Sequence, residues 1–139
     1  MDLDELFEKG LLRKIESSKE RALKSLEAGD KYLAESKKAL GAKAYGLAFI
    51  GAYNSAFHYA RAILFLQGVG ERSHFAVSQY LHIKCKELGQ ELDTLDLYRS
   101  MRHSAQYGLG TEVSERDVKE AIKFASEFGI KIKKKIEED

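Results

Sequence analysis

The sequence lacks proline altogether and contains a single cysteine, Cys85, among its 139 residues. Proline is the residue that most strongly interrupts a helix, so its absence leaves the abundant Ala, Leu, Glu, Lys and Arg free to form long helices. One cysteine cannot form an intramolecular disulfide, and this is the usual situation in a reducing cytoplasm. These two absences indicate a helical protein that is not stabilised by disulfides.

Two further absences concern membranes and charge. The sequence has no run of 18 apolar residues, so we expect no membrane-spanning helix and no membrane partner. The opening "MDLDELFEKG" is acidic and has no apolar signal core, so we expect a cytoplasmic location. The net charge is only +1, so any binding to nucleic acid would require a local basic patch.

The hydrophobic pattern predicts an all-α protein. No segment alternates apolar and polar residues as a half-buried strand would. Short loops between long helices favour an antiparallel up-and-down bundle with four main helices and a short extra N-terminal helix, in one domain over residues 1–139. We expect helices near 2–9, 11–40, 43–67, 74–88 and 91–107, followed by a last helix. The second helix has a possible break near Ser17–Ser18.

Helix ends and buried faces can also be assigned. The helix over 43–67 is apolar almost all round and rich in small residues, so it should be the central one. Residues 68–73, "GVGERS", should form a loop whose Ser73 caps the next helix, and Gly89 should end that helix. Ser114 and Asp117 resemble a capping box for the last helix. The expected buried face of that helix is Val118, Ala121, Ile122, Ala125, Phe128 and Ile132.

Two helices carry a stripe of polar side chains. In "YNSAFHYARAILF" the stripe is Asn54, His58 and Arg61, at steps of four and three, so these residues share one helical face. In "YRSMRHSAQYG" the corresponding residues are Arg99, Arg102, His103 and Gln106, with Tyr107 following. Burying an unpaired arginine costs several kcal/mol, so both stripes need partners, water or a ligand. We expect them to line one polar cleft.

A structural and a functional interpretation remain open for these stripes. In the structural one, His58 bonds a neighbouring carbonyl and Arg61 reaches Asp30 or Glu27 on the preceding helix. In the functional one, Arg102 and His103 form an anion site beside Tyr107. Basic residues near a helix C-terminus are also explained by the helix dipole, at about 0.3–1 kcal/mol each.

Other candidate chemistry is sparse. His82 and Cys85 are one turn apart, but two ligands do not make a metal site, so we expect no metal and no other cofactor. His74 follows the cap Ser73 and is expected only to occupy a first helical turn. No pair of carboxylates suited to acid and base catalysis stands out.

Three blocks of this sequence together resemble the small prokaryotic HEPN domain proteins. The blocks are "AFIGAYNSAFHYARAILFLQG", "SHFAVSQYL" and "LYRSMRHSAQYG", and the stretch "KGLLRKIESSKERALKSLEAGDKYLAESKKAL" is similar to the N-terminal helices of that family. The resemblance covers nearly the whole chain. It implies an α-helical bundle that forms a homodimer and is often paired with a small nucleotidyltransferase in a toxin–antitoxin-like module. It also implies RNA or a nucleotide as ligand, because many members are metal-independent ribonucleases.

The family signature is an arginine followed, after four to six residues, by a histidine. Arg102 matches the arginine, which in the family binds the scissile phosphate. The histidine is displaced, because His103 follows Arg102 directly and the expected window begins at Tyr107. Three hypotheses follow: a binding module with a degenerate site, an active ribonuclease that uses His103 or His58, and a structural helical adaptor.

Overall fold

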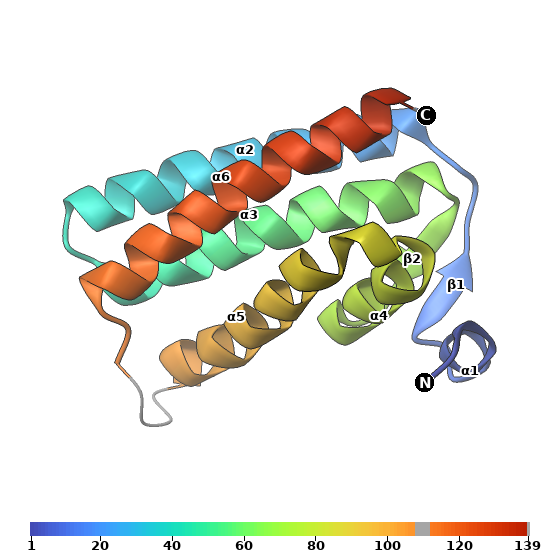
Figure 1. The fold of residues 1–139 in the computed structure, drawn as a ribbon, viewed down its shortest axis with the longest axis horizontal. Helices are drawn as coiled ribbons and strands as arrows, with labels where there is room; N and C mark the ends of the chain where they lie inside the picture. Colours follow the sequence, from blue (N-terminus) through green and yellow to red (C-terminus); the bar gives the residue numbers. More distant parts are fainter. Residues whose placement is uncertain (108–111, 139) are drawn as a thin grey trace.

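The computed structural model describes residues 1–107 and 112–138, with Tyr107 described by its backbone alone (Figure 1). Within these residues the chain is an all-α bundle with one very small sheet, so the expected fold class is confirmed. The elements are α1 Leu3–Glu8, β1 Leu12–Lys14, α2 Lys19–Gly41, α3 Tyr45–Leu66, β2 Val69–Glu71, α4 His74–Lys84, a 3₁₀ turn Lys86–Leu88, α5 Gly89–Tyr107 and α6 Glu115–Glu138. No helix in the described part of the chain is long and apolar enough to cross a membrane.

Helix α3 is the central element of the bundle. It packs against α2, α6, α5 and α4, and Figure 1 shows α2 and α6 running together along one side of it while α4 and α5 lie on the other. Its buried residues include Phe57, Tyr59 and Ala62, which lie on different sides of the helix. This confirms the prediction that an almost uniformly apolar helix is surrounded by its neighbours.

The small sheet corrects two predictions. Residues 11–18 do not extend α2, and part of them forms β1, which pairs antiparallel with β2 inside the segment 68–73 that was expected to be a loop. Gly68 has φ 74°, a left-handed conformation that glycine adopts without strain, and a Cβ there would lie 2.9 Å from the Ile15 carbonyl oxygen. Strands of three residues are too short for their alternation to be read from the sequence.

Serine side chains cap the N-termini of α2, α4 and α6. Ser18 accepts a hydrogen bond from the Arg21 amide at 3.0 Å and starts α2. Ser73 accepts one from the Ala76 amide at 3.1 Å, as predicted for α4. Ser114 and Asp117 form the predicted capping box, with reciprocal bonds of 3.1 and 3.0 Å.

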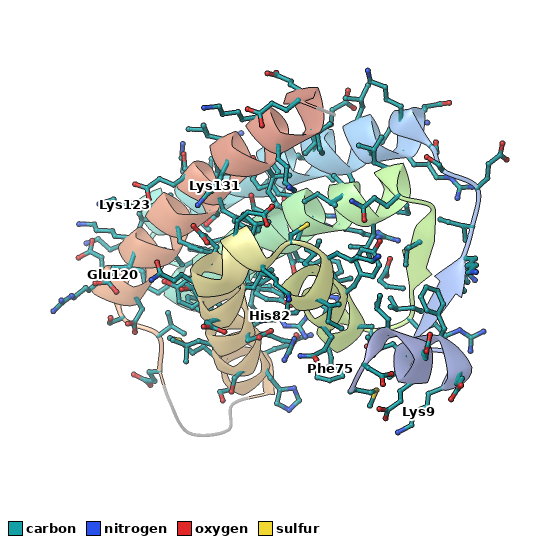
Figure 2. All side chains as sticks on the ribbon, turned by 45° about the vertical axis from the view of Figure 1, so that its right-hand side comes forward. Lys9, Phe75, His82, Glu120, Lys123 and Lys131 are labelled. Carbon is teal, nitrogen blue, oxygen red and sulfur yellow. The ribbon has the colours of Figure 1, made fainter. Side chains whose placement is uncertain are left out.

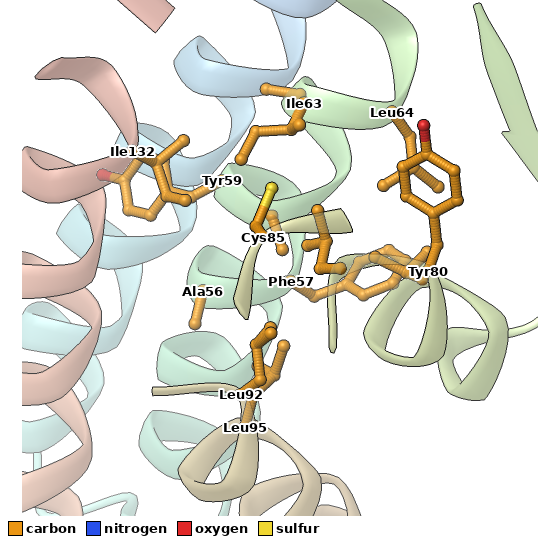
Figure 3. Close-up of a cluster of buried hydrophobic side chains, with 14 of the residues drawn as sticks. Ala56, Phe57, Tyr59, Ile63, Leu64, Tyr80, Cys85, Leu92, Leu95 and Ile132 are labelled. Carbon is orange, nitrogen blue, oxygen red and sulfur yellow. The ribbon is translucent and has the colours of Figure 1, made fainter. Parts of the chain in front are cut away.

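Gly89 has a different position from the one expected. Helix α4 ends at Lys84, the 3₁₀ turn follows, and Gly89 is the first residue of α5. The chain therefore turns sharply between α4 and α5, which places the end of one helix beside the start of the next. In Figure 3, Cys85 at this turn lies in the buried core, with its sulfur pointing toward Ile63 of α3.

The Tyr59 ring joins three helices. It lies against Gly29 of α2 and Gly129 of α6, where a Cβ would be too close to the ring. Its hydroxyl donates to Asp30 at 2.5 Å, and Lys133 donates to the same carboxylate at 2.7 Å. Burial alone would raise the pKa of Asp30, but the hydrogen bonds from Lys133 and Tyr59 lower it below its usual value.

Candidate functional site

Aromatic rings from α3 and α4 form the floor of the candidate site. Because Ser73 caps α4, His74 is the first residue of that helix and its ring faces α3. The His74 ring stacks on Phe57, with centroids 3.7 Å apart and an interplanar angle of 7°. Its Nδ1 lies 2.8 Å from the Tyr53 hydroxyl. The packing of α3 against α4 therefore brings an imidazole and a phenol into direct contact.

Arginines from α3 and α5 surround this pair. The guanidinium carbon of Arg102 lies 5.1 Å from the centre of the Tyr53 ring, within the range of a cation–π interaction. Arg99 lies one turn earlier on α5, and Arg61 is on α3. We call Tyr53, His58, Arg61, His74, Arg99 and Arg102 the His74 cluster, because the positive charges of the three arginines, with His58, act on the His74 ring.

Two of the three arginines have a carboxylate partner. Arg61 donates from Nε to Glu71 at 2.7 Å, and Arg99 donates from Nη1 to Asp96 at 3.1 Å. Arg102 forms no ion pair with any residue that the structure describes. Its Nε is shielded from solvent and has no hydrogen-bond partner among those residues. An unpaired buried donor of this kind costs about 1–3 kcal/mol.

Tyr53 and His74 are both neutral near pH 7. Burial, followed by the charges of Arg102 and Arg99, lowers the pKa of His74 to about 4. Burial also raises the pKa of Tyr53 to about 12, although the same two arginines act in the opposite direction. A neutral phenol and a neutral imidazole can form this hydrogen bond in either direction, depending on which ring nitrogen of His74 carries the hydrogen.

Comparison with models of known protein families identifies the family of this chain. The family model described as HEPN domain matches residues 22–135, which is most of the chain and includes every residue of the His74 cluster. The chain belongs to the HEPN domain family. No curated protein matches the chain.

The two polar stripes of the HEPN chain meet in part. His58 and Arg61 of the first stripe and Arg99 and Arg102 of the second all act on the His74 ring. His58 also stacks on Tyr32 of α2, with centroids 5.2 Å apart. Burial, and then the charge of Arg61, lowers the pKa of His58 below its usual value. The two stripes therefore come together around His74, which belongs to neither of them.

The other predicted site residues are not among the six that define the His74 cluster. His103 and Gln106 are exposed on α5, and Asn54 is half-buried on α3. His103 follows Arg102 directly, and consecutive helical residues point in different directions. The side chain of Tyr107 lies outside the described residues.

The structural interpretation of Arg61 named the wrong partners. Arg61 pairs with Glu71 on β2, while Asp30 is engaged by Tyr59 and Lys133. The sequence predicts a loop around Glu71 and so gives no reason to pair it with Arg61, whereas the structure has a strand there. Of the other two residues considered as metal ligands, His82 lies 3.2 Å from Asp96 and Cys85 is buried.

Sequence reasoning missed Tyr53 and His74. The apolar character of the helix over 43–67 predicts that Tyr53 is buried, which is correct for its ring but says nothing of its hydroxyl. His74 was assigned to a helical first turn, which is also correct but says nothing of the ring. The sequence could have indicated this contact, because a tyrosine in a buried helix requires a hydrogen-bond partner for its hydroxyl.

Proposed function

We propose that this HEPN domain binds a phosphate group of a nucleotide or an RNA strand at the His74 cluster, with Arg102 as the main anchor. The observation that carries the proposal is the Nε of Arg102, which has no partner among the described residues, beside two arginines that already have carboxylate partners. Guanidinium offers a planar fork of donors that matches two phosphate oxygens. In the family resemblance, Arg102 also corresponds to the arginine that binds phosphate.

The energetics favour a movable Arg102. In the observed arrangement its Nε is closed to solvent, so a phosphate can reach this atom only after the side chain changes rotamer. That movement ends the cost of an unpaired donor, about 1–3 kcal/mol, and replaces it with a charge-assisted hydrogen bond. The rotamer change of Arg102 also weakens its cation–π contact with Tyr53, which is worth about 0.5–2 kcal/mol.

An exposed ring beside the cluster favours a nucleotide over free phosphate. Phe75 is 38% exposed on α4, and Arg99 lies 5.8 Å from its ring centre (Figure 2). Single-stranded nucleic acids are commonly bound by stacking a base on an aromatic side chain beside basic groups. A base on Phe75 and a phosphate on Arg102 would use both features.

The test is a titration of fluorescently labelled, short single-stranded RNA with four proteins. These are the wild type, Arg102→Ala, Arg102→Lys and Arg116→Ala. Arg116 is the matched control, because its side chain is 87% exposed and pairs only with Glu120 in the described part of the chain. Both Arg102 variants should weaken binding by about 10–100-fold, since lysine lacks the planar fork. Equal affinity in all four proteins would remove Arg102 from the site.

Competition distinguishes the ligands that share this chemistry. Unlabelled AMP should displace the RNA better than inorganic phosphate, because only AMP has a base to stack. Added salt should weaken binding with a shallow slope, because few charges take part.

For assembly we propose a homodimer that works with a nucleotidyltransferase partner in a toxin–antitoxin-like module. The support is the family resemblance rather than α3, whose apolar residues are largely buried within one chain. Light scattering at micromolar concentration and physiological salt should give twice the chain mass. A monomer under those conditions would contradict the dimer, and failure of a co-expressed nucleotidyltransferase to co-purify would contradict the partner.

A ribonuclease is the second candidate, and the neutral His74 near Arg102 favours it. If Nδ1 carries the hydrogen and donates it to the Tyr53 hydroxyl, Nε2 of the neutral imidazole can accept a proton from an attacking hydroxyl while arginine holds the phosphate. Cleavage of RNA in the presence of EDTA, abolished in His74→Gln, would support this candidate. Cleavage that is lost instead in His103→Ala or His58→Ala would assign the reaction to the histidines suggested by the sequence. Intact RNA in all samples leaves binding as the function.

A further inference from the structure

A second cluster of polar side chains lies where α4 meets α5. Nε2 of His82 is 3.2 Å from Oδ2 of Asp96 and 3.7 Å from Oδ1 of Asp93. One ligand atom from each of these three residues lies within 4.8 Å of the others. Figure 2 shows His82 on the outer face of the molecule, between these two helices.

The local fold explains how the three residues come together. Asp93 and Asp96 are three positions apart in α5, so their carboxylates share one face of that helix. His82 is in the last turn of α4, and the short turn between the helices places it opposite the first turns of α5. Buried Leu81, Leu88 and Leu92 pack beneath this contact and fix the two helices together.

We propose that His82, Asp93 and Asp96 bind a divalent transition-metal ion of the zinc type. Zinc lies about 2.0–2.2 Å from imidazole nitrogen and carboxylate oxygen, so two ligands of a tetrahedral ion are about 3.4 Å apart. The separations of 3.2 and 3.7 Å from the His82 nitrogen match this spacing. Three protein ligands leave the fourth position to water or to an external ligand.

The surroundings of Asp96 support a built site. Its Oδ2 faces His82, while its Oδ1 accepts a hydrogen bond from Nη1 of Arg99 at 3.1 Å. Carboxylate ligands are commonly held by such an outer hydrogen bond, which fixes their orientation and leaves the other oxygen for the metal. Arg99 also belongs to the His74 cluster, so the two clusters are in direct contact through one side chain.

The ligand set also predicts which ions bind. An imidazole nitrogen suits zinc and its neighbours in the first transition row, whereas magnesium prefers oxygen ligands and retains its waters. We therefore expect zinc to bind and magnesium to compete poorly. The alternative is that the three residues form only an ion-pair cluster that joins α4 to α5.

The experiment is a zinc titration of the purified full chain, by calorimetry, with and without excess magnesium. The decisive variant is Asp93→Asn, because the Asp93 side chain is 79% exposed and its replacement leaves the contact between His82 and Asp96 in place. Glu120→Gln is the matched control, as it removes an exposed carboxylate that pairs only with Arg116 in the described part of the chain.

We expect one zinc ion per chain in the wild type, with little change in magnesium. Asp93→Asn should weaken zinc binding by at least about tenfold, and Glu120→Gln should leave it unchanged. NMR of the histidine rings should show the largest zinc-induced shift at His82. Absence of zinc binding, equal affinity in Asp93→Asn, or a shift centred on another histidine would overturn the proposal. None of these results depends on whether the His74 cluster binds phosphate.

Discussion

The hydroxyl of Tyr53 lies 2.8 Å from Nδ1 of His74 and connects the central helix α3 to the first residue of α4. The same tyrosine ring lies beneath the guanidinium of Arg102, 5.1 Å away. Tyr53 therefore contacts both groups, since its hydroxyl is bonded to the His74 imidazole and its ring packs against the Arg102 guanidinium. The proposed phosphate site depends on this arrangement, and the predictions below test its parts separately.

Tyr53→Phe should destabilise the protein while keeping the ring on which Arg102 lies. The substitution removes the hydroxyl that is bonded to His74 and leaves Nδ1 of a half-buried ring without its partner, at a cost of about 1–3 kcal/mol. Urea denaturation measures the loss. Tyr45→Phe is the control, because the Tyr45 hydroxyl has no hydrogen bond within the described residues. Equal stability of the two variants would show that the Tyr53–His74 bond contributes nothing.

The stability of the protein should fall as the pH is lowered from about 6.5 to about 4. In this window the unfolded chain protonates its histidine at position 74, whose usual pKa is 6.5, while burial and neighbouring arginines keep the folded His74 neutral down to about 4. The unfolded state then binds more protons, so the free energy of unfolding decreases as the pH falls. The groups that face this ring are Tyr53, His58, Arg61, Arg99 and Arg102.

His74→Gln isolates this contribution. Glutamine does not titrate and its side-chain oxygen can still accept from Tyr53. The variant should lose less stability than the wild type between pH 6.5 and pH 4, when both are measured by urea denaturation. His58, whose pKa is also lowered, contributes to the pH dependence of the free energy of unfolding in both proteins. Parallel pH profiles would contradict a neutral, buried His74.

Gly129→Ala should destabilise the bundle by about 1–3 kcal/mol, because a Cβ at this position would lie 2.5 Å from Cε2 of Tyr59 and the ring cannot move freely between α2 and α6. Gly46→Ala is the matched control. It is also a helical glycine, but a Cβ there meets nothing within 4 Å, so alanine should be neutral or stabilising by up to about 1 kcal/mol. A thermal melt that ranks the two variants in the opposite order would contradict the packing of Tyr59.

The elements that the sequence predicts well depend on residues close together along the chain. Ser73 and Ser114 could be assigned as caps, because each bonds an amide three positions later. The central place of α3 follows from its composition alone, since a helix that is apolar on every side has no face for solvent.

The missed features depend on contacts between distant residues. Glycine is a poor helix former, but at Gly29 the lack of a side chain makes room for Tyr59 of another helix. The ion pair of Arg61 with Glu71 requires β2, a strand that is too short to detect. Tyr53 and His74 are 21 positions apart, and no spacing rule for one helix can connect them.

The central claim is that Arg102 binds a phosphate group through its Nε, which has no partner in the described part of the chain. NMR of the arginine Nε–H groups tests this claim most directly. Labelled protein is titrated with AMP, and the Nε–H signal of Arg102 is followed beside that of Arg116, which is paired with Glu120 at 3.2 Å. The account predicts a saturable shift of the Arg102 signal and none for Arg116. An Arg102 signal that stays unchanged while AMP binds elsewhere, or no binding of AMP at all, would contradict it.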